Sequence, residues 1–163
     1  MTDTLTPDDV KKALSAAGLD TEIQFFESST ATSQQAADNI GCELGQIVKS
    51  LCFMINDERP VLVLASGDRR IDERKLSALY DVGRKKVRAA DAEQCIAIFG
   101  YAPGGVPPLG HRTAGIPVHV DESLKRYTRV YAAGGAHNAI FPVQLDDLVN
   151  ATGGQFTDVK RDD

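Results

Sequence analysis

The sequence contains no long apolar run and no recognisable leader. Runs such as Val61 to Ala65 are far shorter than the ~20 residues that a membrane-spanning helix requires. The N-terminus, MTDTLTPDDV, has no basic region followed by an apolar stretch. We therefore expect neither a signal peptide nor a membrane anchor, and we expect a cytoplasmic protein.

Cysteines and histidines are few and far apart. The three cysteines, Cys42, Cys52 and Cys95, are an odd number, and their spacing is not that of a disulfide framework or a zinc site. The histidines likewise show no metal-type spacing. We expect buried or half-buried thiols in a reducing cytosol, and no metal.

Common catalytic and cofactor motifs are also missing. The chain has no P-loop, no Gly-x-Gly-x-x-Gly after a strand and no Gly-x-Ser-x-Gly elbow. Nothing pairs Cys42 or Cys52 with a base, which argues against a cysteine nucleophile. We therefore expect no cofactor, and the sequence gives little support to serine-hydrolase chemistry.

The charge of the chain is acidic overall but uneven. A net charge of −5 gives no general attraction to nucleic acid. Either an ordinary solvated surface or a local patch for a phosphate backbone can explain the basic residues, and composition does not decide between them. These residues gather in two runs: Arg69, Arg70, Arg74 and Lys75, then Arg84, Lys85, Lys86 and Arg88.

Length and hydrophobic patterning predict one domain over residues 1–163 with a mixed α/β fold. The 42% hydrophobic content suffices for one sizeable core. Helical and strand patterns interleave, with hairpin-like pairs late in the chain, which favours a mixed sheet with flanking helices. We predict helices near 7–17, 33–40, 73–80, 91–99 and 145–152, and strands near 23–27, 46–55, 61–65, 87, 116–120, 129–133 and 139–143.

Lys49 is unusual because it lies on the apolar face of a predicted strand. It shares that face with Ile47 and Leu51 at a period of two residues. Burying an unpaired ammonium is costly. The side chain either lies at a strand end or edge and reaches water through its apolar stem, or it points into a pocket. In a pocket it would hold a phosphate or a developing negative charge.

A glycine–proline loop, Gly104 to His111, is the second unusual feature. Adjacent glycines allow backbone N–H groups to approach a ligand closely, and the prolines stiffen the turn. The loop can bind an anion or form an oxyanion hole, or it is an ordinary turn between a helix and a strand.

Two further features concern a glycine pair and a histidine. Gly134 and Gly135 predict a tight turn between strands, which can line a pocket without requiring a function.

His119 alternates with apolar Val118 and Val120, so we expect it on the surface. His111 is the one histidine expected near a site.

Four blocks of the sequence together resemble the YbaK/EbsC-type, prolyl-tRNA-synthetase-associated aminoacyl-tRNA editing domains. They stand in the order found in that family and extend from about Thr32 to Gly153. The blocks are TSQQAA with GQIVKSLCF (32–37 and 45–53), GDRRIDERKL (67–76), GYAPGGVPPLGH (100–111) and VYAAGGAHNAIF (130–141).

The resemblance implies an α/β fold with a mixed, barrel-like sheet. It implies a deacylase that hydrolyses the ester between an amino acid and the terminal adenosine of a mischarged tRNA, without a metal or a protein nucleophile. Carried onto this sequence, the implied catalytic residues are Lys49, Gly104, Gly105 and Pro108. The implied substrate-binding residues are Thr32, Val106, Pro107, His111, Gly134 and Gly135.

The substrate and the partner stay open at this point. The preferred hypothesis is a trans-acting deacylase of tRNA with the proline anticodon and a small amino acid such as alanine, cysteine or serine, working beside prolyl-tRNA synthetase. The alternative is a non-catalytic module of the same fold that binds tRNA or a synthetase. A DNA-binding protein is disfavoured by the net charge of −5 and the absence of a helix-turn-helix pattern.

Overall fold

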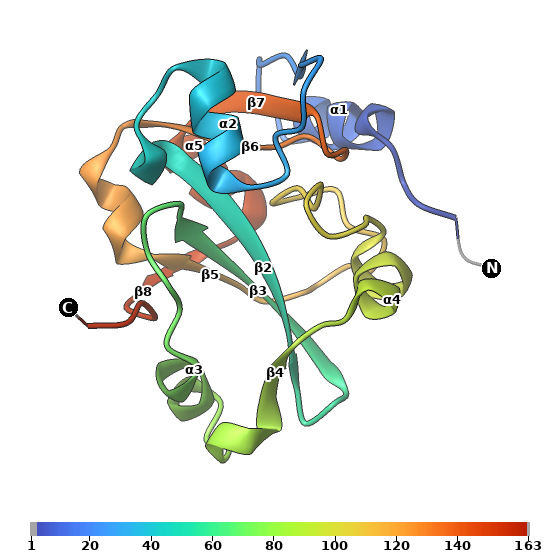
Figure 1. Cartoon of the computed structure of the whole chain (residues 1–163). Helices are drawn as coiled ribbons and strands as arrows, with labels where there is room; N and C mark the ends of the chain where they lie inside the picture. The colour runs from blue at the N-terminus through green and yellow to red at the C-terminus, as the bar shows by residue number, and fades with distance from the viewer. Residues whose placement is uncertain (1–2, 163) are drawn as a thin grey trace.

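The computed structural model describes residues 3–162, in which helices flank a single mixed sheet (Figure 1). The helices are α1 (Pro7–Ala16), α2 (Ser33–Ile40), α3 (Glu73–Leu79), α4 (Ala92–Gln94) and α5 (Leu145–Thr152). The strands are β1 (Gln24–Phe25), β2 (Ile47–Ile55), β3 (Arg59–Ser66), β4 (Val87–Ala89), β5 (Val118–Asp121), β6 (Arg129–Ala133), β7 (Ala139–Gln144) and β8 (Gln155–Thr157). Short helical turns are η1 (Leu44–Gln46), η2 (Arg84–Lys86), η3 (Cys95–Phe99) and η4 (Glu122–Arg126).

Capping residues fix the bounds of α2, as the sequence predicts. The Thr32 hydroxyl accepts a hydrogen bond from the Gln35 amide at 3.1 Å, and the Gln35 side chain accepts one from the Thr32 amide at 3.2 Å. The helix ends at Gly41, which has a φ of 80° in the left-handed region. The start of α2 is therefore rigid, which matters because it borders the cavity described below.

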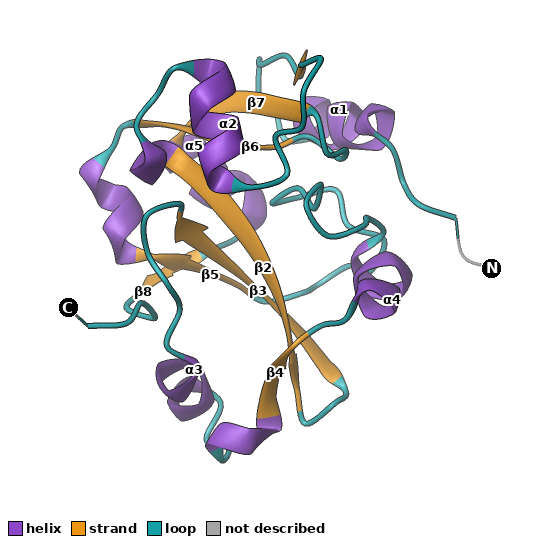
Figure 2. Cartoon of the chain, in the orientation of Figure 1, coloured by secondary structure: helices purple, strands orange, loops and turns teal. Residues whose placement is uncertain are grey.

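The sheet has the mixed topology that the sequence predicts (Figure 2). Its order is β1-β7-β6-β2-β3-β5-β8, and β4 pairs with β2 outside this path. β2 is antiparallel to β3 along most of its length. On its other edge, β2 pairs with β6 only at Ile47 and Val48, and with β4 only from Phe53 to Ile55. Among residues 3–162, no strand pairs with the middle of this edge, between the two pairings.

In the larger core, side chains from most strands meet α1, α5, η3 and η4. Its fully buried members include Leu64 of β3, Val120 of β5, Phe141 of β7 and Leu148 of α5. Because these side chains come from distant parts of the sequence, burying them together holds the sheet and the helices in one packed unit.

α3 covers the opposite face of β2 and β3. Leu76 of α3 packs with Phe53 and Ile55 of β2 and with Val61 and Val63 of β3. Both faces of β3 are therefore buried, which is why its sequence is continuously apolar rather than alternating.

His119 of β5 is half-buried, so the prediction of surface exposure is wrong. Its Nε2 lies 2.6 Å from the Tyr80 hydroxyl oxygen, and the two rings meet edge to face with centroids 5.6 Å apart. Burial lowers the pKa of His119. Alternation with Val118 and Val120 does not expose this residue, because the end of α3 covers this face of the sheet as well.

Several element bounds differ from the predictions. β1 is only two residues long, and β8 and η4 had not been predicted. β3 begins at Arg59 and so includes Pro60, but β5 pairs with β3 only from Leu62 onward. The missing N–H of Pro60 therefore removes no bond to β5. Gly134 and Gly135 begin a longer connection between β6 and β7 rather than a tight turn.

The three thiols are free, with Cys52 and Cys95 buried and Cys42 half-buried, as predicted. Between residues 3 and 162, the His, Cys, Asp and Glu side chains form no group of three or more that could hold a metal ion. Within the same residues, no helix is both long and apolar enough to cross a membrane.

Replacing Leu64 tests the placement of the larger core. Leu64→Ala is expected to lower the free energy of unfolding by about 2–5 kcal/mol, because it leaves a cavity among fully buried side chains. Leu79→Ala is the matched control, since Leu79 is 48% exposed, and its effect is expected to stay within about 0.5 kcal/mol. Urea denaturation followed by circular dichroism measures both, and equal losses would contradict this core.

Candidate functional site

A cavity of about 460 Å³ opens beside the free edge of β2. Its wall combines the start of α2, the middle of β2, the residues after β4, the start of η3 and the glycine–proline loop. The polar and sulfur-containing side chains that line it are Thr30, Thr32, Ser33, Lys49, Ser50, Cys52 and Cys95, and the loop adds Pro103, Gly104 and Val106.

The free edge of β2 supplies backbone hydrogen-bonding groups to this cavity. Neighbouring residues of a strand point their N–H and C=O groups to opposite edges. The Gly67 amide donates to the Ile47 carbonyl on the β3 side at 2.8 Å, whereas the Ala90 amide donates to the Cys52 carbonyl on the β4 side at 2.9 Å. Ser50 therefore points its N–H and C=O away from β3, at a level where neither β6 nor β4 pairs with β2.

The Ser50 side chain adds another polar group at the same place. Its hydroxyl oxygen is buried and has no hydrogen-bond partner among residues 3–162. Leaving a buried hydroxyl unpaired costs about 1–3 kcal/mol, so such groups are rare in folded proteins unless they serve a ligand. Sequence reasoning missed Ser50, although it directly follows Lys49 in the block GQIVKSLCF.

Lys49 lies in the cavity wall and is half-buried. Its Nζ donates a hydrogen bond to the carbonyl oxygen of Arg69, in the loop after β3. An ammonium carries three N–H donors, so this bond leaves two for a ligand. Burial lowers the pKa of Lys49, the nearby Arg70 lowers it further, and Asp68 raises it. Lys49 therefore lines the cavity, and its ammonium is bonded to the loop after β3.

The glycine–proline loop reaches the cavity through Gly104 and Val106. Neither of these two amides donates to another backbone group within the described part of the chain. Gly104 has a φ of 92°, a conformation that glycine adopts without strain. Gly105 lies behind the wall, where a Cβ atom would stand 3.0 Å from the backbone of Ala136. The loop is therefore packed tightly against the β6–β7 connection.

Pro107, Pro108 and His111 do not line the cavity. Both prolines are buried, and the His111 Nε2 lies 2.7 Å from the Pro107 carbonyl oxygen. Burial lowers the pKa of His111, which favours a neutral imidazole whose N–H donates to that carbonyl. These residues fix the shape of the loop from behind the cavity wall.

The structure does not bring Gly134 or Gly135 to the cavity. A Cβ atom at Gly134 would lie 2.9 Å from Ile23, and one at Gly135 would lie 2.9 Å from Val10. Ala133, the residue before them, is the part of this segment that lines the cavity. Thr32 does line it, with its hydroxyl engaged in capping α2.

The two buried thiols, those of Cys52 and Cys95, line part of the cavity wall, and the sequence did not predict this position for them. Cys52 comes from β2 and Cys95 from η3, so only the fold brings them together. The neighbouring Cys95 thiol raises the pKa of Cys52, and burial raises it further. Cys52 is therefore a neutral thiol at physiological pH and presents a small, polarizable surface to the cavity.

The electrostatic character of the cavity is simple. Its lining includes one charged side chain, Lys49, and no carboxylate. The same lining includes Ser50, whose hydroxyl is unpaired, and the glycine–proline loop residues Gly104 and Val106. Such an arrangement of donors stabilises a small ligand at the point where it carries or develops negative charge.

A comparison with protein families identifies the class of protein. Residues 27–151 match the model of the aminoacyl-tRNA editing domain, and this range contains every cavity-lining residue named above. The chain therefore belongs to the aminoacyl-tRNA editing domain family of the YbaK type, which confirms the resemblance of the four sequence blocks.

Similar proteins share most of this chain. The uncharacterized protein YwhH of Bacillus subtilis (strain 168) is 36% identical over 128 residues, which is 78% of each chain. The protein EbsC of Enterococcus faecalis, named as a candidate Cys-tRNA(Pro)/Cys-tRNA(Cys) deacylase, is 26% identical over 128 residues, 78% of this chain and 76% of EbsC. A solved structure of a candidate trans-editing enzyme for prolyl-tRNA synthetase has a TM-score of 0.88 and 37% identity, covering 96% of this chain and 97% of that one.

The chain is also similar to part of a synthetase. The proline–tRNA ligase of Lactobacillus johnsonii is 35% identical over 117 residues, which is 72% of this chain but 20% of the ligase. A domain of this family therefore occurs inside a much longer enzyme.

Gly105→Ala tests the close packing of the loop. The new methyl group would meet the Ala136 backbone at 3.0 Å, so either the loop or the β6–β7 connection must shift. We expect a loss of about 1–3 kcal/mol in the free energy of unfolding, the usual cost of overpacking. Gly83→Ala is the control, because a Cβ atom there meets nothing within 4 Å. Thermal denaturation compares the stability of the two variants. A Gly105→Ala protein as stable as the unmodified protein would refute this packing.

Proposed function

We propose that this chain is a trans-acting aminoacyl-tRNA deacylase, and that it hydrolyses the ester of tRNA(Pro) charged with a small amino acid. The observation that carries the proposal is the set of donors on residues that line one cavity: the Lys49 ammonium, the unpaired Ser50 hydroxyl, and the free amides of Gly104 and Val106. Membership in the editing-domain family, and the names of EbsC and the solved trans-editing structure, support the class of reaction.

These donors suit the hydrolysis of an ester. When water attacks, its oxygen bonds to the carbonyl carbon and negative charge builds on the carbonyl oxygen. The Gly104 and Val106 amides donate to that oxygen, and fixed donors of this kind stabilise the transition state without reorganisation. Lys49 neutralises the same oxygen or holds the adjacent phosphate of the tRNA terminus.

The leaving group and the proton complete the reaction. The bond between the carbonyl carbon and the ribose oxygen breaks, and a proton from the water passes to that ribose oxygen. The cavity lining contains no carboxylate or imidazole to act as a general base. We infer that the neighbouring ribose hydroxyl of the substrate orients the attacking water, while the cavity supplies the binding geometry.

The size and lining of the cavity favour a small amino acid. Its volume of about 460 Å³ has to hold the ester and ribose as well as the amino-acid side chain. The wall nearest the thiols is small and weakly polar, so alanine, cysteine or serine fits better than a large or charged side chain. Small side chains are also the ones that a synthetase cannot reject by binding alone, which gives an editing enzyme its purpose.

Prolyl-tRNA synthetase is the partner that the comparisons support. A domain of this family lies inside the Lactobacillus johnsonii proline–tRNA ligase, and the solved trans-editing structure is named for the same synthetase. A separate chain with this fold would act on the mischarged tRNA after release, in the cytoplasm where translation takes place.

A deacylation panel tests the proposal. The purified protein is mixed with tRNA(Pro) charged separately with alanine, cysteine, serine, threonine and proline, and loss of the labelled amino acid is followed over time. We expect rapid loss of one non-cognate amino acid. Lys49→Ala is expected to slow it about 100- to 1,000-fold, as for other removed transition-state donors. Ser50→Ala is expected to slow it about tenfold, the value of one hydrogen bond.

Lys12→Ala is the control for this panel, because Lys12 is exposed on α1 and outside the cavity. If folded Lys49→Ala and Gly104→Ala proteins kept full activity, the assigned site would be wrong. Tight binding of tRNA without turnover of any of the charged forms would instead favour the alternative, a non-catalytic binding module.

The basic turn η2 is proposed to bind the phosphate backbone of the acceptor stem. Arg84, the first residue of this turn, pairs with Glu73 at 3.0 Å, and Arg88 in β4 pairs with Asp57 at 2.5 Å, so both of these charges are neutralised. Lys85 and Lys86 are exposed, and β4 leads directly from this turn to the cavity. The two lysines are therefore the charges of the second basic run that are best placed for tRNA.

Neutralising both lysines tests this contact. Lys85→Gln with Lys86→Gln is expected to weaken tRNA binding and to reduce the slope of log K against log salt concentration by about 2, one unit for each phosphate contact. Lys11→Gln with Lys12→Gln removes the same charge from α1 and is the control. Filter binding at several salt concentrations measures the slopes, and an unchanged slope in the η2 variant would rule the contact out.

A further inference from the structure

The carbonyl group that receives Lys49 belongs to a loop that is held from two sides. This loop, residues 67–72, connects β3 to α3 and carries Arg69. Surface loops of this kind are ordinarily the most mobile parts of a domain. Here, side chains and backbone from the last third of the chain tie down both halves of the loop.

Arg126 at the end of η4 holds the first half. Its two terminal nitrogens donate to the two carboxylate oxygens of Asp68 at 2.9 and 2.7 Å, and one of them also donates to the Ser66 hydroxyl at 2.8 Å. The hydrogen bonds from Arg126 lower the pKa of Asp68 to about 2. Asp68 is therefore ionised at neutral pH, and the paired contact has the two-pronged geometry that fixes orientation best.

The C-terminal segment holds the second half of the loop. The Arg161 amide donates to the Arg70 carbonyl at 2.7 Å, and the Asp72 amide donates to the Val159 carbonyl at 2.8 Å. These bonds lie on either side of the short pairing between Ile71 and Lys160. The loop is thus paired with residues that follow β8.

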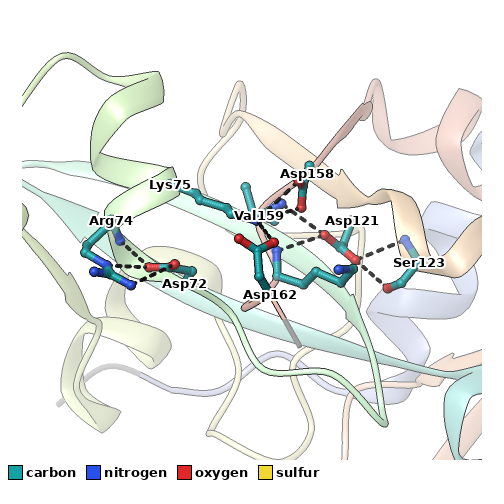
Figure 3. A network of polar contacts seen from close by, with 9 residues as sticks. Asp72, Arg74, Lys75, Asp121, Ser123, Asp158, Val159 and Asp162 are labelled. Atoms are coloured by element: carbon teal, nitrogen blue, oxygen red, sulfur yellow. Dashed lines mark hydrogen bonds and ion pairs between the residues drawn. The ribbon is translucent and has the colours of Figure 1, made fainter.

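Asp121 anchors this C-terminal segment to η4. Its buried carboxylate accepts hydrogen bonds from the Val159 and Lys160 amides at 3.0 and 3.1 Å, and from the Ser123 amide at 3.0 Å (Figure 3). The Arg126 Nε donates in turn to the Ser123 carbonyl at 2.7 Å. The two attachments therefore flank one short turn, since Asp121 is the residue directly before η4 and Arg126 is its last residue.

We propose that η4 is a clamp that positions Lys49, because its Arg126–Asp68 ion pair and its Asp121-bound C-terminal segment together fix the loop whose Arg69 carbonyl receives the Lys49 ammonium. Arg126, Asp68 and Asp121 act through Lys49 and are positioning residues. The C-terminal part of the clamp lies beyond residues 27–151, so part of the frame of the site falls outside the matched family domain.

The clamp matters because Lys49 is long and half-buried, and its ammonium is held by a hydrogen bond to the Arg69 carbonyl. A free lysine side chain has four rotatable bonds and spreads over many conformers. Fixing the carbonyl acceptor selects one conformer of the Lys49 side chain. The effect on deacylation rests on the proposed function, whereas the effect on Lys49 itself does not.

Nuclear magnetic resonance of the protein labelled with ¹³C at the lysine ε-carbons tests the clamp. The Lys49 signal is assigned by its absence in Lys49→Ala. In the unmodified protein, we expect the two ε-protons of Lys49 to be inequivalent, because the ammonium is held in one place. Arg126→Gln is expected to make them equivalent, as in the exposed Lys85, and Arg126→Lys to restore part of the difference.

The same variants are also expected to change the rate of deacylation. If the chain deacylates tRNA, Arg126→Gln is expected to lower kcat about 100-fold with little change in KM, because a small displacement of a catalytic group has an effect of that size. Arg126→Lys is expected to recover part of the loss. No deacylation by the unmodified protein would refute the proposed function and leave the resonance test of the clamp intact.

Arg88→Gln is the matched control. Arg88 also pairs with an aspartate and is 44% exposed, compared with 36% for Arg126, but it lies at the far end of the β2–β3 hairpin. We expect the Lys49 signal to be unchanged in this variant. If Arg126→Gln does not fold, Asp68→Asn removes the Arg126–Asp68 ion pair with a smaller change in the side chain. We then expect the two ε-protons of Lys49 to become equivalent in Asp68→Asn. An unchanged Lys49 signal in a folded variant of the pair, even one with a lowered melting temperature, would overturn the proposal.

Discussion

The incomplete pairing of β2 is the constraint on which the rest of the site depends. A central strand ordinarily uses both edges to satisfy its backbone groups, because unpaired N–H and C=O groups are costly to bury. β2 does so along β3. On its other edge, the pairing of β2 with β6 ends at Val48 and the pairing with β4 begins only at Phe53. The gap leaves backbone groups of Ser50 free, and the cavity lies where a further strand would otherwise run.

The fold tolerates this gap because the rest of β2 is well supported. Both faces of β2 and β3 are packed, on one side by the core that includes Leu64 and on the other by Leu76 of α3. The cavity beside this gap is lined by Lys49, by Ser50 with its unpaired hydroxyl, and by the glycine–proline loop. Unsatisfied groups gathered in this way cost stability and are typical of a site that a ligand completes.

Particular residues show how far sequence reasoning reached. The capping box at Thr32 and the strand carrying Lys49 were predictable, because capping and two-residue periodicity are local properties of the chain. His119 was misplaced because alternation reveals exposure only when one face of a sheet is open to water, and α3 covers the second face. Gly134 was expected in the cavity wall, but its lack of a side chain serves close packing against Ile23.

The sequence by itself determined the order of the elements, the family and the two segments that carry the site, because each depends on residues close together in the chain. Only the tertiary structure decided which of those residues meet. It placed Ser50 and the glycine–proline loop in the wall of one cavity, and it brought the free thiols of Cys52 and Cys95 together there. It also brought Arg126 and the C-terminal segment to the loop after β3, whose Arg69 carbonyl holds Lys49. Such contacts depend on how strands far apart in sequence pair and on where one stops pairing, and no local pattern of residues encodes that.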